Sequence, residues 1–191
     1  MAKMYPNITG RVGLDAAFHH IQQGLLDGLS WLDDAFGRTE RRERDFNGRK
    51  RRVQCVYKGV GAPKNDYLEL TPDSEIGNYS FFVLRDPTTI VNRNNIQRRV
   101  KQPVSLVFWF NFDRISGNYE GRNIEAVKLH IMQVLKGCAF SGGRLVVNRI
   151  YEDSRNVWKD LAEVSDLAMY HPFAGLRFDG ELTYLEPCVT F

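Results

Sequence analysis

The strongest hydrophobic pattern in the chain lies between residues 103 and 112. At a period of two, one face of this segment is wholly apolar: Val104, Leu106, Phe108, Phe110 and Phe112. The opposite face is mixed: Ser105, Val107, Trp109 and Asn111. This alternation predicts a β-strand. The mixed face is too apolar for open solvent and too polar for a conventional core. We therefore expect it to be covered by another part of the chain or by a neighbouring subunit.

Apolar residues at helical spacing predict helices before and after this strand. One helix is predicted from Gly13 to Phe36, and a second from Ile124 to Gly137, where the glycine supplies a stop. A shorter third helix is predicted between Val157 and Met169. Gly24 and Gly28 weaken the first helix, but they lie one turn apart and so allow another backbone to approach closely.

Further short apolar or alternating runs predict a sheet around the central strand. The predicted strands are Val53–Tyr57, Tyr67–Leu70, Tyr79–Leu84, Leu145–Tyr151 and Leu176–Leu185. In the last of these, Arg177 and Asp179 fall on a polar face that we expect to meet water or a partner, which is typical of an antiparallel sheet. The basic residues between 88 and 102 predict an exposed connector.

These elements predict an α+β fold. We expect an antiparallel or mixed β-sheet with helices packed on one face. The chain is read as one domain, residues 1–191, which includes a long basic and β-rich excursion over residues 38–102. A hydrophobic content of 43% with 12% aromatic residues is sufficient for a sizeable core in 191 residues.

The composition bears on the cellular compartment and on the redox state of the cysteines. No stretch approaches the roughly 18 apolar residues that a membrane helix needs, and the N-terminus shows no apolar signal segment. We therefore expect a protein without a membrane partner that is made in a cytoplasm. The three cysteines are far apart and form no C-x-x-C pair, which predicts reduced thiols and no structural zinc.

The net charge of +3 is modest, but it is unevenly distributed. Eight of the 26 Lys and Arg residues fall within residues 38–52, and Asn47–Gly48 in the same segment predicts the tip of a hairpin. The segment is interpreted either as an arm that contacts nucleic-acid phosphates or as a loop that faces solvent or a subunit. Three interleaved acids, Glu40, Glu43 and Asp45, favour the second interpretation. The candidate contact residues are Arg41, Arg42, Arg44, Arg49, Lys50, Arg51, Arg52 and, on the central strand, Trp109.

No catalytic motif emerges from the sequence. Ser141 lacks the G-x-S-x-G elbow, and the phosphate-loop and dinucleotide-binding spacings are missing. A group of acidic residues near the basic run suggests a Mg²⁺ nuclease as an alternative: Asp66, Glu69, Asp73 and Glu75. The carboxylate-x-Lys pair that the common nuclease core carries on a following strand is missing. The sequence therefore predicts a protein that is not an enzyme, with no catalytic residue, metal or cofactor.

The order of elements resembles that of a known family. An amphipathic helix leads through strands to the hydrophobic strand, a second helix, another strand, a short helix and a closing strand that contains Leu182-Thr183-Tyr184. This arrangement is similar to the tail-terminator and head-tail neck proteins of tailed bacteriophages. The resemblance implies a virion structural subunit of a phage or prophage, made in the bacterial host cytoplasm, that forms a homo-oligomeric ring at the head-tail junction.

The partners that this resemblance implies are other neck proteins and tail-tube proteins, and it leaves open contact with DNA passing through the lumen of the ring. The alternative hypothesis is a nucleic-acid-binding protein that uses segment 38–52. Aromatic residues interleaved with the strands favour this alternative, because bases stack on such rings: Tyr57, Tyr67, Tyr79, Phe81 and Phe82.

Overall fold

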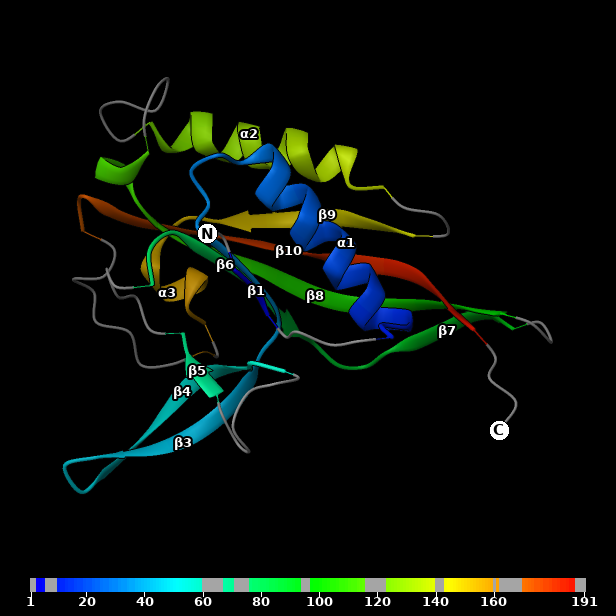
Figure 1. Ribbon diagram of the computed structural model, residues 1–191, viewed down its shortest axis with the longest axis horizontal. Helices are drawn as coiled ribbons and strands as arrows, with labels where there is room; N and C mark the ends of the chain where they lie inside the picture. Colours follow the sequence, from blue (N-terminus) through cyan, green and yellow to red (C-terminus); the bar gives the residue numbers. More distant parts are fainter. Residues whose placement is uncertain are drawn as a thin grey trace.

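The fold is built on one large mixed sheet and one small sheet (Figure 1). The computed structural model describes residues 3–5, 10–59, 67–70, 76–93, 97–115, 123–139, 143–159, 161 and 170–187. The large sheet has the strand order β1-β2-β6-β8-β10-β9, and β7 also pairs with β8. Its strands are β1 Lys3–Tyr5, β2 Asp34–Arg38, β6 Tyr79–Leu84, β7 Thr89–Arg93, β8 Gln97–Asn111, β9 Arg144–Tyr151 and β10 Phe173–Pro187. The small sheet has the order β3-β4-β5, with β3 Glu40–Phe46, β4 Arg49–Tyr57 and β5 Tyr67–Glu69.

The remaining elements are helical, and together with the sheets they confirm the predicted α+β class. They are α1 Gly13–Gly28, the short 3-10 helix η1 Phe112–Arg114, α2 Ile124–Gly137 and α3 Ser154–Val157. The β1–β2 and β2–β6 pairs are parallel and the other pairs are antiparallel, so the large sheet is mixed.

The antiparallel pair β8–β10 forms the centre of the large sheet. The predicted apolar face of β8 packs under α1 and α2, which Figure 1 shows on the same side of the sheet. The two helices contact each other where Gly24 faces Cys138 and Gly28 faces Val134. The absence of a side chain at both glycines leaves room for the side chains of Cys138 and Val134, where the spacing predicts the approach of a backbone. Asn123 caps α2 by accepting a hydrogen bond from the backbone of Ala126.

The opposite side of the sheet, here called the far face, carries a second core. Val107 and Trp109 of β8 pack there with Tyr79 and Phe81 of β6. The cover comes from the same chain, through residues of the small sheet and of the α3 region: Val56, Leu70, Val157, Trp158 and Leu161. The mixed face of the central strand is therefore buried within one subunit. Trp109 is only 1% exposed, so in the folded protein it is not available for the predicted contact with a partner.

The first helix is shorter than predicted. It ends at Gly28, and Asp34–Arg38 forms β2 in place of further helical turns. Leu29, Trp31 and Leu32 are buried in the same core as α1, so the apolar pattern continues after the backbone has left the helix. Asp33 and Asn78 fix the turn into β2, because each donates a backbone N–H to the other residue over 2.8 Å.

Three other expectations also change in the structure. The basic residues between 88 and 102 form β7 and the start of β8 and not an exposed connector. The predicted excursion over 38–102 is not one unit. Its strands β3, β4 and β5 form the small sheet, whereas β6, β7 and the start of β8 belong to the large sheet. The third helix is α3 at Ser154–Val157, ending where the predicted helix begins, and residues 162–169 of that prediction lie outside the described residues.

Candidate functional site

The predicted hairpin of the basic segment is confirmed, and it forms an arm. The arm, residues 40–52, consists of β3 and the first part of β4, paired in antiparallel register from Glu40↔Cys55 to Phe46↔Arg49. Asn47 and Gly48 have φ values of 53° and 77°, as a two-residue type I′ turn requires. Gly48 also donates its backbone N–H to the Asp45 carboxylate over 2.7 Å. Figure 1 shows the arm extending away from the body of the protein.

The base of the arm is fixed to the body. The Thr39 hydroxyl and backbone N–H both donate to the carbonyl of Phe82 on β6, over 2.9 and 3.0 Å. Gln54 donates its side-chain amide to the Thr39 hydroxyl. Val56 is buried in the second core, and Leu68 packs against it. The arm therefore extends from a well-packed base. The described side chains of the arm itself, residues 40–52, are mostly exposed.

Some cations of the arm are paired within the small sheet. Arg44 contacts Glu69 over 2.5 Å, Arg42 contacts Glu40 over 3.8 Å, and Lys50 contacts Glu43 over 3.7 Å. The Arg42 guanidinium also lies over the ring of Tyr67, 3.3 Å from its centroid. These groups are largely exposed, so each ion pair contributes little, about 0–1 kcal/mol.

The remaining predicted contact residues are better placed to meet a partner. Arg41, Arg49 and Arg52 are exposed, and within the described part of the chain they make no ion pair. The Arg51 side chain lies outside the described residues. The seven basic candidates thus share one arm, whereas Trp109 lies in the second core away from them.

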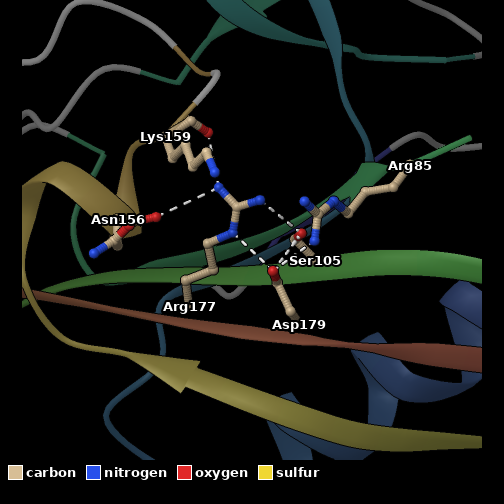
Figure 2. Close-up of polar contacts among 6 residues, drawn as sticks. All are labelled: Arg85, Ser105, Asn156, Lys159, Arg177 and Asp179. Carbon is tan, nitrogen blue, oxygen red and sulfur yellow. Dashed lines mark hydrogen bonds and ion pairs between the residues drawn. The ribbon is translucent and has the colours of Figure 1, made fainter.

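A second polar arrangement, which the sequence does not single out, lies under α3 (Figure 2). Arg177 and Asp179 of β10 project from the far face, and Arg177 Nε donates to Asp179 Oδ1 over 2.8 Å. Ser105 of β8 donates its hydroxyl to the same carboxylate oxygen over 2.6 Å. Arg85, which follows β6, contacts the other oxygen, Asp179 Oδ2, over 2.6 Å. The expectation that this face of β10 meets water or a partner is wrong for Arg177 and Asp179, because α3 and the residues after it cover them.

The same guanidinium secures α3 to the sheet. Arg177 Nη1 donates to the carbonyl of Lys159 over 2.7 Å and to that of Asn156 over 3.5 Å (Figure 2). Burial by itself would raise the pKa of Asp179. The hydrogen bonds from Ser105 and Arg177 and the nearby positive charges outweigh burial, so the pKa of Asp179 is lowered. Ser105 is fully buried, so its contact with the carboxylate is closed to a substrate and serves to hold β8, β10 and α3 together.

One sequence signal points to this network in retrospect. Arg177 and Asp179 are two residues apart in an alternating strand, so they must share a face. The third member of the network, Ser105, lies beside them only because β8 and β10 pair with Ser105 opposite Asp179. These two residues are 74 positions apart in the sequence. Sequence alternation alone does not supply that register.

The described residues offer few groups suited to catalysis or metal binding. Within them, no group of three or more His, Cys, Asp or Glu side chains is arranged to hold a metal ion. Of the acidic group considered for Mg²⁺, Glu69 pairs with Arg44, and Asp66, Asp73 and Glu75 lie outside the described residues.

The described cysteines and helices carry no further functional feature that the sequence singles out. Cys55 and Cys138 are free thiols, as expected, and burial raises the pKa of both. Cys188 lies outside the described residues. In the described part of the chain, no helix is long and apolar enough to cross a membrane.

Comparison with known proteins assigns no family. No protein-family model matches the sequence, and no characterised protein matches it significantly. The arm and the arrangement of the sheet are therefore the features that bear on function.

Proposed function

We propose that this chain is a non-enzymatic structural subunit that assembles with copies of itself into a ring. The observation that carries the proposal is the arm, which is anchored at its base and exposes Arg41, Arg49 and Arg52 beyond the body. A two-stranded ribbon without a core of its own is at best marginally stable in water, so a partner surface that covers the arm would stabilise it.

Charge supports a second copy as that partner. Residues 38–52 hold eight bases and three acids, a net charge of +5, while the whole chain carries +3. The rest of the chain therefore carries −2, opposite in sign to residues 38–52, which contain the arm. An arm that docks on the body of the next subunit makes a heterologous contact, and such contacts close into rings when the rotation between subunits permits. The acids on the arm suit a protein surface of mixed charge better than a uniform phosphate backbone.

The order of elements supports a subunit of the tail-terminator kind. The helix, the strands, the long hydrophobic strand, the second helix and the closing strand follow one another as they do in the family that the sequence resembles. On this proposal the ring lies at the head-tail junction of a phage or prophage particle. Its partners are the other neck proteins and the tail-tube proteins, and it is made in the host cytoplasm before it joins the virion.

Size-exclusion chromatography with light scattering tests the assembly. The wild-type chain is expected to form an oligomer whose population grows with protein concentration. The triple variant Arg41→Glu, Arg49→Glu and Arg52→Glu should shift it to the monomer. The matched control reverses three exposed cations on or next to the helices, Lys136, Arg155 and Lys159, and should assemble like the wild type. A wild-type monomer at every concentration, or equal losses in the two variants, would refute the role of the arm.

A nucleic-acid-binding arm remains the second candidate, and one observation favours it. Arg42 lies over Tyr67, and the rings of Tyr57 and Tyr67 are 5.4 Å apart on the same face of the small sheet. Cations beside exposed aromatic rings are typical of surfaces on which bases stack, and a two-stranded ribbon fits the major groove of DNA. Loss of a salt-dependent DNA shift on neutralising Arg49, Lys50, Arg51 and Arg52 would support this function over the first.

A further inference from the structure

The far face of the large sheet also carries a groove that no part of the proposed function uses. The groove has a volume of about 390 Å³ and lies where β7, β8, β10 and β9 adjoin. Residues that line it include Arg99, Lys101, Arg144, Val146, Glu181 and Thr183. In Figure 1 this end of the sheet, marked by β7, lies far along the long axis from the arm. The second core covers the other part of the far face.

The strand register arranges four polar side chains of this region in one row. Arg144 of β9 pairs with Thr183 of β10, Thr183 pairs with Lys101 of β8, and Lys101 pairs with Thr89 of β7. Residues that are directly paired across strands project from the same face. The row therefore alternates cation, hydroxyl, cation and hydroxyl across four adjacent strands. Neighbouring strands are about 4.8 Å apart, so the two cationic residues of the row start about 10 Å apart.

The groove has an excess of positive charge. Glu181 contacts Lys101 over 2.7 Å, and both side chains stay partly exposed. Arg99 and Arg144 are exposed, and among the described residues they form no ion pair. Two guanidinium groups are therefore left to meet an anion, beside hydroxyls that also donate hydrogen bonds. The half-exposed Val91 and Val146 add apolar surface to the lining.

We propose that this groove binds the phosphate groups of a nucleic-acid strand that lies across β9, β10, β8 and β7. Arginine presents a planar fork of donors that matches a phosphate, and the threonine hydroxyls supply further donors between the cations. The cations are spread along the row and do not converge on one point, which suits successive phosphates of a polymer better than one free phosphate. The two valines provide a surface for the sugars. The inference does not depend on ring assembly or on the arm, since it uses none of their residues.

Fluorescence anisotropy with a labelled 20-nucleotide strand and the corresponding duplex tests this proposal on the full chain. The groove variant combines Arg99→Gln, Lys101→Gln and Arg144→Gln. The matched control, Lys136→Gln with Arg155→Gln and Lys159→Gln, removes the same charge elsewhere. At 50 mM salt the groove variant should bind at least about tenfold more weakly than the wild type, and the control should change by less than about threefold. The slope of log affinity against log salt should decrease by about 2, because each lost phosphate contact removes 0.7 to 0.9.

Two further measurements make the proposal specific. Thr183→Val keeps the shape and charge of the groove but removes a hydroxyl from the row, and it should weaken binding by about threefold to tenfold, as expected for one net hydrogen bond. Inorganic phosphate should compete much less well than unlabelled oligonucleotide at equal phosphate concentration. Circular dichroism checks that each variant is folded.

The proposal is overturned if the wild type binds neither probe at 50 mM salt, or if the groove and control variants lose affinity equally. It is also overturned if free phosphate competes as well as the polymer. A third variant, Arg41→Gln with Arg49→Gln and Arg52→Gln, separates the two basic surfaces. If only this variant loses binding, the arm and not the groove is the nucleic-acid site. If the arm variant fails to assemble while the groove variant fails to bind, both proposals stand.

Discussion

Arg177 and Asp179, two residues apart on β10, form an ion pair inside the protein. Arg177 Nε donates to Asp179 Oδ1 over 2.8 Å, and the side chains are 3% and 10% exposed. The guanidinium also reaches the carbonyls at the end of α3, and the carboxylate accepts from Ser105 and Arg85. A single pair thus joins the central strands to the helix that covers the second core.

Removing the cation of this pair should destabilise the fold strongly. We expect Arg177→Met to lower the free energy of unfolding by about 3 kcal/mol, because it removes the charged partner of a buried carboxylate and the donor to the Lys159 carbonyl. Arg177→Lys should recover only part of the loss, since an ammonium group cannot replace the planar fork. Urea denaturation measures both, and the exposed Arg155→Met on α3 is the control. A loss no larger than that of the control would contradict the structural role of the pair.

The lowered pKa of Asp179 predicts a pH dependence with a definite sign. A carboxyl whose pKa is lower in the folded state adds stability above its unfolded pKa of about 3.9 and loses that stability as the pH falls through the folded pKa. The wild type should therefore be more stable than Asp179→Asn at pH 7, and the gap should shrink below pH 4. Urea titrations from pH 7 to pH 3 measure the gap. A gap that stays constant over this range would show that the ionisation of Asp179 does not contribute.

The contact between α1 and α2 predicts an unusual response to alanine. In most helices, replacing an interior glycine by alanine stabilises the protein by up to about 1 kcal/mol. Here a Cβ at Gly24 would overlap the Cys138 sulfur, and one at Gly28 would overlap the Val134 methyl groups. We expect each alanine variant to be destabilised by about 1 to 3 kcal/mol, as overpacked cores are.

Gly137 of α2 is the matched control for these glycines, because a Cβ there meets no atom of the described residues within 4 Å. Gly137→Ala should leave the melting temperature unchanged or raise it. Higher melting temperatures for Gly24→Ala and Gly28→Ala would mean that the helices can move apart at little cost.

The sequence was sufficient for elements whose pattern is local. The alternation of residues 104 to 112 predicted both the central strand and its burial on two sides, and Asn47–Gly48 predicted the tip of the arm. The apolar pattern predicts too long a first helix, because Leu29 and Leu32 stay in the core beside α1 after the backbone has turned. It also missed the start of β8, where Arg98, Arg99 and Lys101 place charge on both faces of the strand.

Features that depend on strand register could not be predicted from the sequence. The buried network needs Ser105 opposite Asp179, and the groove needs Lys101 and Arg144 on either side of Thr183. These partners are separated by 39 to 82 residues in the chain, and alternation fixes which face each one occupies but not which residue it meets. The intrachain cover of Trp109 was hidden for a similar reason, since the residues that bury it come from β6, the small sheet and the α3 region.

Trp109 provides the last prediction. Its ring centroid lies 5.1 Å from that of Phe173 and 5.7 Å from that of Tyr79. Because the side chain fills the second core, Trp109→Ala should lower the free energy of unfolding by about 3 to 5 kcal/mol. The exposed Tyr170→Ala should stay within about 0.5 kcal/mol of the wild type. At a temperature where the Trp109 variant is still folded, its oligomeric state and its nucleic-acid binding should match those of the wild type. A variant of normal stability that fails to assemble would instead place Trp109 at a subunit contact.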